Sequence, residues 1–208
     1  MNNYSYWENK KTTSEELSII KILLDKDLIS LGTVLHIGTG NGEALKKLYK
    51  KAIKFIGITI AGNEFNYVNS LNISNNINYL ADKYDSSNMN SLIPNNSVDY
   101  IIDINLKSFA PNSKSFNLMM DNFHNYLRVG GKIITSHSGM GFSSALTVSG
   151  NNLIQSSESV KENLLSKSEL IDYSIKYKMK FSEKHITRRF FKGFKLRKKN
   201  EILYILEK

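Results

Sequence analysis

Gly38, Gly40 and Gly42 alternate along the segment Val34-Leu-His-Ile-Gly-Thr-Gly-Asn-Gly42, directly after a short apolar run. The run contains β-branched residues and predicts a buried strand, and the residues from Glu43 onward repeat apolar side chains at helical spacing. Glycines permit the positive φ angles of a tight turn and let the backbone approach a ligand closely. The spacing therefore predicts a strand–turn–helix unit that binds a nucleotide at its turn.

The glycine spacing limits which nucleotide this turn can bind. A dinucleotide-binding turn has the pattern G-x-G-x-x-G, which would place its third glycine at position 43. That position is Glu43, and the third glycine comes one residue earlier. A phosphate loop needs a Gly-Lys-Ser/Thr tripeptide, which the sequence lacks. The pattern argues against a nicotinamide dinucleotide and against a nucleoside triphosphate.

The amino-acid composition limits the classes to which this protein can belong. The chain has 208 residues, 41% of them hydrophobic, which is enough for one domain with a sizeable core. It contains no cysteine, which excludes a disulfide framework, a cysteine nucleophile and a zinc–thiolate site. No apolar run approaches 18 residues, and the first residues lack the apolar segment of a signal peptide. We therefore expect a soluble, cytoplasmic protein that does not act at a membrane.

Apolar segments with β-branched residues alternate with segments of helical periodicity, which indicates an α/β fold. We expect a single Rossmann-like, doubly wound and mostly parallel sheet that ends in a C-terminal antiparallel β-hairpin. Residues 1–30 would form an N-terminal lid or helix segment, and residues 31–208 the ligand-binding domain. The expected strands are Thr33–Ile37, Lys54–Ile60, Asn78–Ala81, Val98–Ile104 and Gly131–Ser136, with the hairpin formed by Lys184–Phe191 and Glu201–Leu206 around a basic turn.

From about residue 30 to the C-terminus, several segments together resemble the class I S-adenosylmethionine-dependent methyltransferases. The G-x-G-x-G turn is similar to their motif I, and Asp82 follows the third expected strand, where their motif III acid lies. The segment Leu127-Arg-Val-Gly-Gly resembles their L-R-P-G-G turn into the fifth strand, with Val129 in place of proline. The resemblance implies S-adenosylmethionine as the cofactor.

The same resemblance implies a set of cofactor-binding residues. The acid that usually binds the ribose is replaced by Thr59, a departure similar to that in cyclopropane-fatty-acid-synthase-like methyltransferases, and Glu64 would take the place of their nearby glutamine. Glu64 would otherwise be a first-turn carboxylate that complements a helix dipole, and Asp82 an ordinary turn residue. The full set is His36, Ile37, Gly38, Thr39, Gly40, Gly42, Thr59, Glu64, Asp82, Lys83, Asp103 and Asn105.

Methyl transfer from a sulfonium is an in-line displacement that needs alignment, a dry pocket and, for some acceptors, a base. His137, just past the fifth strand, is the first candidate base, and Asp103, at the end of the fourth, is the second. Tyr6, Asn105 and His137 are candidate substrate-binding residues. No metal site is expected. The segment Asp103-Ile-Asn-Leu106 lacks the Asn/Asp-Pro-Pro-aromatic tetrapeptide of adenine, cytosine and glutamine-amide methyltransferases, so methylation of that type is not expected. O-, S- or C-methylation, or methylation of an already nucleophilic amine, stays open, and of these we expect O-, S- or amine N-methylation.

Basic residues gather at the C-terminal end. Residues 176–208 carry 12 Lys and Arg against 3 acids, so the rest of the chain is close to neutral. We expect a methyltransferase for a small polar or anionic metabolite, which the basic hairpin would attract, and in which the short segment 139–169 would cap the substrate. One alternative is an RNA-modifying methyltransferase whose hairpin contacts phosphates. The other is a non-catalytic relative that binds the cofactor. The sequence does not indicate the oligomeric state.

Overall fold

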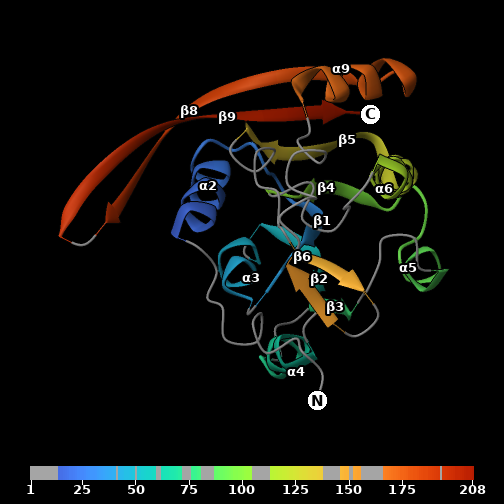
Figure 1. Cartoon of the computed structure of the whole chain (residues 1–208), viewed down its shortest axis with the longest axis horizontal. Helices are drawn as coiled ribbons and strands as arrows, with labels where there is room; N and C mark the ends of the chain where they lie inside the picture. The colour runs from blue at the N-terminus through green and yellow to red at the C-terminus, as the bar shows by residue number, and fades with distance from the viewer. Residues whose placement is uncertain are drawn as a thin grey trace.

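The structure is a computed structural model that describes residues 14–40, 42–49, 51–59, 62–71, 76–80, 87–104, 113–137, 146–149, 152–155, 166–192 and 194–208. Its centre is a seven-stranded sheet with the order β3-β2-β1-β4-β5-β9-β8 (Figure 1). The first five strands are parallel, β9 runs antiparallel to β5, and β8 antiparallel to β9. These strands are β1 (Gly32–Ile37), β2 (Ala52–Thr59), β3 (Asn76–Leu80), β4 (Val98–Ile102), β5 (Leu127–Ser136), β8 (Lys180–Lys192) and β9 (Lys195–Glu207).

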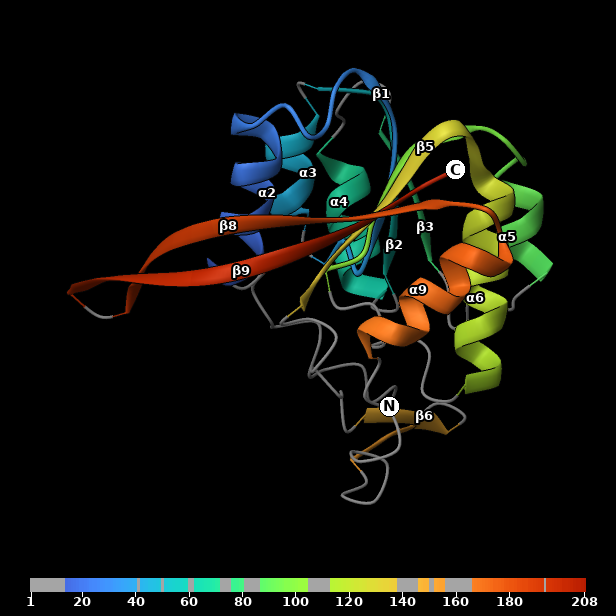
Figure 2. The ribbon, with the colours of Figure 1, turned by 90° about the horizontal axis from the view of Figure 1, so that it is seen from above.

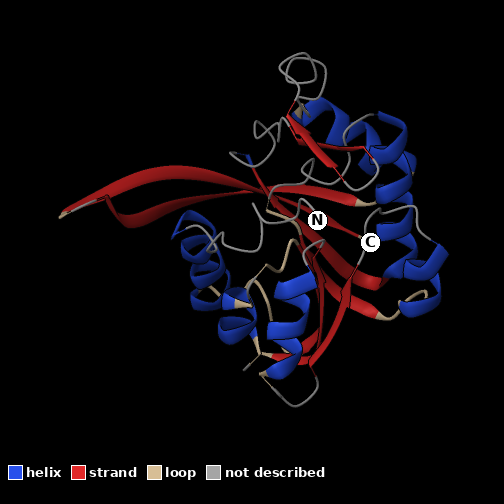
Figure 3. Ribbon diagram, turned by 60° about the horizontal axis from the view of Figure 1, so that its bottom comes forward, coloured by secondary structure: helices blue, strands red, loops and turns tan. Residues whose placement is uncertain are grey.

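Helices cover both faces of the sheet (Figures 2 and 3). One face packs against α2 (Ser14–Asp25), α3 (Glu43–Leu48) and α4 (Gly62–Ser70), and the other against α5 (Ser87–Leu92), α6 (Ser113–Tyr126) and α9 (Lys167–Lys176). Side chains alternate between the two layers along each strand, so Val34 and Leu35 belong to different cores. Burial on both faces explains why the strands read as continuous apolar runs.

The expected doubly wound sheet is confirmed. One helix and one small two-stranded hairpin were not foreseen. Helix α5 is short and polar, so it gives little helical periodicity in the sequence. Strands β6 (Leu146–Ser149) and β7 (Asn152–Gln155) form a separate two-stranded hairpin inside the segment that was expected to cap the substrate. In the described part of the chain, no helix combines the length and apolarity needed to cross a bilayer.

The predicted C-terminal hairpin exists, but its strands are much longer than expected. β8 and β9 have 13 residues each and pair without interruption from Lys180–Glu207 to Lys192–Lys195. Residues 195–200, which were expected to belong to the basic turn, are therefore strand. Their polar, unalternating sequence gives no strand signal, because this part of β9 is exposed on both faces.

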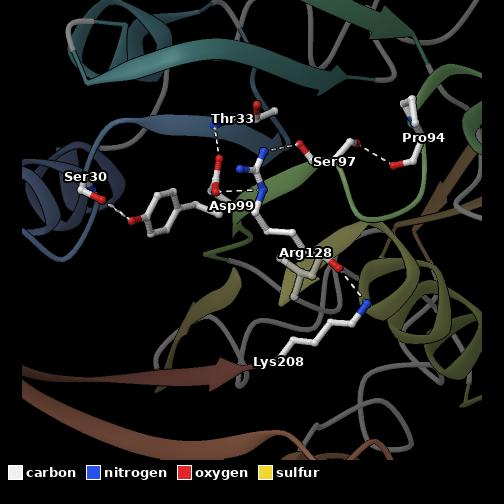
Figure 4. Close-up of polar contacts among 9 residues, drawn as sticks. Ser30, Thr33, Pro94, Ser97, Asp99, Arg128 and Lys208 are labelled. Atoms are coloured by element: carbon white, nitrogen blue, oxygen red, sulfur yellow. Dashed lines mark hydrogen bonds and ion pairs between the residues drawn. The ribbon is translucent and has the colours of Figure 1, made fainter. Parts of the chain in front are cut away.

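A polar network ties together the edge of the sheet where the parallel strands begin (Figure 4). Asp99 accepts a 2.6 Å hydrogen bond from the Thr33 amide and forms a 3.0 Å ion pair with Arg128. Lys208 donates to the carbonyl oxygens of His124 and Leu127, both at 2.7 Å. These contacts fix β1, β4, β5 and the end of α6 relative to one another, and the opposite edge remains for a ligand.

Candidate cofactor and acceptor site

The strand order reverses between β1 and β4. From β1 the chain proceeds outward through β2 and β3, whereas β4 and β5 lie on the other side of β1. In open α/β sheets, ligands bind beyond the carboxyl ends of the strands at such a switch point. The strand register aligns His36, Ile102, Ile134 and Ile205 in one row, so the carboxyl ends of β1, β4 and β5 meet at the same edge.

The glycine turn lies at this edge, between β1 and α3. Gly38, Gly40 and Gly42 have φ angles of 72°, 53° and 76°, in the left-handed region that favours glycine. Two backbone hydrogen bonds hold the turn, from the Thr39 amide to the Ile58 carbonyl at 2.8 Å and from the Gly42 amide to the Thr39 carbonyl at 3.1 Å. The alternation predicted a tight turn, and the structure confirms it.

Gly42 is also required by packing. A Cβ atom at this position would lie 2.8 Å from Cγ2 of Val68 in α4, closer than real Cβ contacts. Gly42 is the N-cap residue of α3, and no side chain caps the helix there. The third glycine therefore serves two purposes at once: it adopts the left-handed angle that begins α3, and it lets α3 and α4 approach each other.

Two buried threonines flank the glycine turn. Thr39 is only 1% exposed, and its hydroxyl oxygen has no hydrogen-bond partner among the described residues. Thr59 is the last residue of β2 and is also buried; because Ile58 pairs with Ile37, it lies opposite Gly38. A buried hydroxyl is normally hydrogen-bonded, so Thr39 fits a ligand that brings a polar group to the turn.

His36 precedes the turn and lies beneath α2. Its side chain is fully buried, with Nε2 3.3 Å from the Glu16 carboxylate and its ring 6.1 Å from that of Phe55, centroid to centroid. The imidazole therefore links β1 to α2. A cofactor-binding role for His36 stays a prediction. Because its side chain lies beneath α2, the backbone of His36 is the part that would contact the cofactor.

The carboxyl ends of β4 and β5 bring the candidate acceptor residues to the same edge. Asp103 is buried directly after β4, and its amide donates to the Ile134 carbonyl at 3.0 Å. Ser136 donates its hydroxyl to the Ile104 carbonyl at 3.1 Å and so joins the two strand ends. His137 follows β5 and is exposed, and its Nδ1 lies 2.9 Å from the Tyr204 hydroxyl.

Tyr204 was not foreseen as a partner of His137. It is a buried residue of β9, and its ring stacks on Phe181 of β8. Burial, reinforced by the Glu183 carboxylate, raises the pKa of the Tyr204 phenol, which therefore stays protonated near neutral pH. The sequence held no signal for this contact, because it depends on the antiparallel register in which Thr135 faces Tyr204.

Several predicted site residues lie outside the described residues, namely Tyr6, Asp82, Lys83 and Asn105. Glu64 is the third residue of α4, and its side chain also lies outside them. Their predicted roles stay predictions. Within the described ranges, no cluster of His, Asp and Glu side chains has the arrangement that would hold a metal ion.

Arg188 belongs to the basic C-terminal stretch, but its side chain is buried. Its side chain is 0% exposed and forms a 3.0 Å ion pair with Glu201, which is 2% exposed. Both residues lie on the face that α2 covers, because they share that face with Ile186 and Leu203. Arg188 lies two residues after Ile186, and Glu201 lies two residues before Leu203, so both charged residues are on the apolar side of their strands. This spacing is the sequence signal that could have identified the buried pair.

No family model matches this chain, and neither does any curated protein. Solved structures match nearly all of it. The chain is similar to the PH0226 protein from Pyrococcus horikoshii OT3, with 15% identity over 96% of this chain and 92% of that one and a TM-score of 0.63. It is also similar to N-methyltransferase NodS from Bradyrhizobium japonicum WM9, with 11% identity over 93% and 94% and a TM-score of 0.61.

A third similar structure is a SAM-dependent methyltransferase from Methanosarcina mazei, with 11% identity over 89% of this chain and 96% of that one and a TM-score of 0.58. The structures that match are mostly SAM-dependent methyltransferases. The chain therefore has the Rossmann-like fold of the class I methyltransferases, as the motifs in the sequence implied. Because the sequence identities are 15% or lower, the similarity to these structures establishes the fold alone.

Proposed function

We propose that this protein is an S-adenosylmethionine-dependent methyltransferase that binds its methyl donor over the glycine turn. The observation that carries the proposal is this left-handed turn, formed by Gly38, Gly40 and Gly42 at the switch point between β1 and β4. The turn begins a helix whose first residue is Glu43. A carboxylate there disfavours a pyrophosphate, so the turn suits a nucleoside without phosphates better than a dinucleotide.

Several residues would hold the donor. The backbone of Gly38 and Gly40 allows close approach, the buried Thr39 hydroxyl would accept or donate a hydrogen bond, and Thr59 would face the ribose. The donor, when bound, supplies an electrophilic methyl group. The protein must orient the acceptor in line with that group and exclude water.

We propose His137 as the residue that accepts a proton where the acceptor must lose one. The Tyr204 hydroxyl oxygen is 2.9 Å from Nδ1 and, in the tautomer that carries its proton on Nδ1, accepts a hydrogen bond from Nδ1–H. This tautomer leaves Nε2 without a proton and free to act as a base. Asp103, buried at the adjacent strand end, is the second candidate for the same role.

Replacing Tyr204 with phenylalanine tests the role of His137. The variant removes the hydroxyl and keeps the ring that stacks on Phe181, so we expect turnover to fall by about tenfold, with little change in donor affinity. Unchanged turnover in Tyr204→Phe would remove His137 from the proposed mechanism.

Calorimetric titration with S-adenosylmethionine and S-adenosylhomocysteine tests the donor site, with NADH and ATP as competing candidates. We expect both sulfur ligands to bind in the micromolar range and Gly40→Arg to abolish binding, because the side chain would fill the turn. Gly130→Arg is a matched control. Gly130 also has a positive φ, 78°, but lies at the opposite edge of the sheet with open space around it. Preference for NADH would refute the proposal, and binding without turnover would favour a non-catalytic relative.

For the methyl acceptor, we propose a chemical class. A small polar or anionic metabolite, methylated at oxygen, sulfur or an amine nitrogen, is the acceptor that the sequence favoured. An RNA acceptor is the second candidate, and a specific observation favours it. That observation is the shape and charge of the C-terminal strands.

A further inference from the structure

Strands β8 and β9 extend far beyond the rest of the sheet. The last residue of β5, Ser136, pairs with Leu203, which in turn faces Lys184. Residues 185–192 and 194–202, called the arm below, therefore have no neighbouring strand in the main sheet. At about 3.3 Å per residue, the arm extends roughly 25 Å past the end of β5, and α2 covers one face of its root. Figures 1 and 3 show it as a two-stranded ribbon that leaves the body of the molecule.

The arm is densely basic. Residues 185–200 contain seven Lys and Arg and no Asp or Glu, and Glu201, at the root, is the one acid of the arm. Arg188 is buried against Glu201 at the root of the arm. The side chains of five others are exposed, and none forms an ion pair within the described residues; they are Arg189, Lys195, Arg197, Lys198 and Lys199.

The pairing of these charges differs between the arm and the body of the sheet. In the body, Lys132 and Lys180 both face Glu207, and Lys132 forms a 3.7 Å ion pair with it. In the arm, basic residues occupy facing positions on the two strands, at Arg188–Lys199 and Arg189–Lys198. Like charges in this position destabilise a sheet. A hairpin with a purely structural role would gain stability from acids at these positions.

Three of the cations form a row. Lys195, Arg197 and Lys199 occupy alternate positions of β9 and so point to the same face, roughly 7 Å apart along the strand. That face is shared with Arg188 and Ile186, the side of the sheet that carries α2 and α3. A linear row of cations complements a linear polyanion better than a compact anion.

The end of the arm also exposes apolar side chains. Phe194, at the tip between the strands, is 106% exposed, and the neighbouring Leu196 is 53% exposed. Water contacts the whole Phe194 ring, which contributes nothing to the core. An aromatic ring beside a row of cations is the combination with which proteins bind unpaired nucleotides, by stacking on the base and pairing with the phosphate.

We infer that the arm is a binding surface for single-stranded RNA. The cations of β9 contact successive phosphates, and Phe194 stacks on an unpaired base. The basic charge of the arm and the exposed ring of Phe194 together favour single-stranded RNA as the bound molecule. A phosphate-only contact with duplex DNA or an anionic glycan would leave Phe194 without a function, and an anionic membrane, into which Phe194 could insert, is distinguished by the competition experiment below.

The arm leaves the sheet at the edge that carries the donor site. Its root lies one residue beyond the level of Gly38, Ile104 and Ser136, and Tyr204, which contacts His137, lies two residues inside it. Three strand spacings, or about 14 Å, separate the ends of β1 and β9. RNA on the arm would thus be held on the side of the sheet that carries the glycine turn. The inference that the bound RNA is the methyl acceptor rests on the proposed function; the inference that it binds does not.

Fluorescence anisotropy with a labelled mixed-sequence single-stranded RNA, measured without donor, tests the binding surface. We expect affinity to fall with salt with a log–log slope of about −3.5, which corresponds to five phosphate contacts. The triple variant Lys195→Gln/Arg197→Gln/Lys199→Gln should lower affinity by about tenfold or more and reduce the magnitude of the slope by about 2. Phe194→Ala should lower affinity by roughly fivefold to a hundredfold and leave the slope unchanged.

The matched control removes three exposed lysines outside the arm, in Lys21→Gln/Lys26→Gln/Lys47→Gln, which changes the net charge equally. We expect RNA affinity to stay within about twofold of the unsubstituted protein, because loss of net charge alone is a long-range effect that salt screens. Equal losses in the control and in the arm variant would contradict a surface located on the arm.

Competition separates the possible occupants. Unlabelled single-stranded RNA should displace the probe at concentrations at which duplex DNA, heparin and anionic lipid vesicles do not. Equal or better competition by any of these three would overturn the inference. Calorimetry with S-adenosylhomocysteine on the arm variants keeps the two proposals apart. Donor binding without RNA binding would refute the arm surface alone, and RNA binding without donor binding would refute the donor site alone.

Discussion

The variant Glu201→Leu should lose about 3–5 kcal/mol of unfolding free energy, the largest effect that we expect of any single substitution in the described part of the chain. Glu201 forms a 3.0 Å ion pair with Arg188, and both side chains are almost completely buried. Removing the carboxylate leaves the guanidinium in a low-dielectric position without that partner, and the cost of burying this charge then falls on the folded state. Urea unfolding followed by circular dichroism measures the loss.

Two further variants show whether the cause is the buried charge. The double variant Arg188→Met/Glu201→Leu removes both charges and keeps apolar volume, so it should regain most of the stability. Glu207→Gln breaks a 3.7 Å ion pair with Lys132 whose side chains are about one third exposed or more, and it should lose less than about 1 kcal/mol. A loss in Glu201→Leu no greater than that in Glu207→Gln would refute the argument.

The second large effect is expected of Gly42→Ala, which should lose about 2–4 kcal/mol of stability. The φ angle of 76° is unfavourable for alanine, and the new Cβ atom would lie 2.8 Å from Val68 Cγ2. Because α3 must move away from α4 to relieve the contact, the glycine turn should be displaced, and affinity for S-adenosylmethionine should fall by about tenfold or more. Urea unfolding and calorimetry measure the two effects.

Gly130→Ala separates the two causes. Gly130 has nearly the same φ, 78°, but a Cβ atom there meets nothing within 4 Å. We expect it to lose only about 1 kcal/mol, the backbone part of the effect, and to keep donor affinity. The double variant Gly42→Ala/Val68→Ala should lose less than the sum of its single variants, because it relieves the overlap. Equal losses in Gly42→Ala and Gly130→Ala would show that packing against Val68 is irrelevant.

The parallel body of the sheet could be predicted because each of its strands is covered on both faces. Continuous apolar runs such as the one before Gly38 then mark the strands, and glycines mark the turn. The arm could not be predicted in the same way. The residues of β9 between Lys195 and Asn200 are exposed on both faces, so their strand conformation comes from pairing with β8 and leaves no apolar pattern. Helix α5 was missed because its sequence, Ser-Asn-Met-Asn-Ser-Leu, has weak helical preference.

The candidate site was predictable where backbone conformation determines the residue type. Gly38, Gly40 and Gly42 were identified from their spacing, and their positive φ angles agree with it. Contacts that depend on register between distant strands were not identified. The Tyr204 hydroxyl reaches His137 across 67 residues of sequence, and Arg188 reaches Glu201 only because β8 and β9 pair at that register. No local pattern encodes either distance.

The crystal structure of this protein with S-adenosylhomocysteine would test the central claim most directly. The proposal places the ligand over the turn formed by Gly38, Gly40 and Gly42, with a polar atom within hydrogen-bonding distance of the Thr39 hydroxyl and the ribose beside the end of β2. Density at that position would support the methyl-donor site. Ligand density at another place on the sheet would contradict it. The absence of ligand density would also contradict it if the same protein binds NADH in solution.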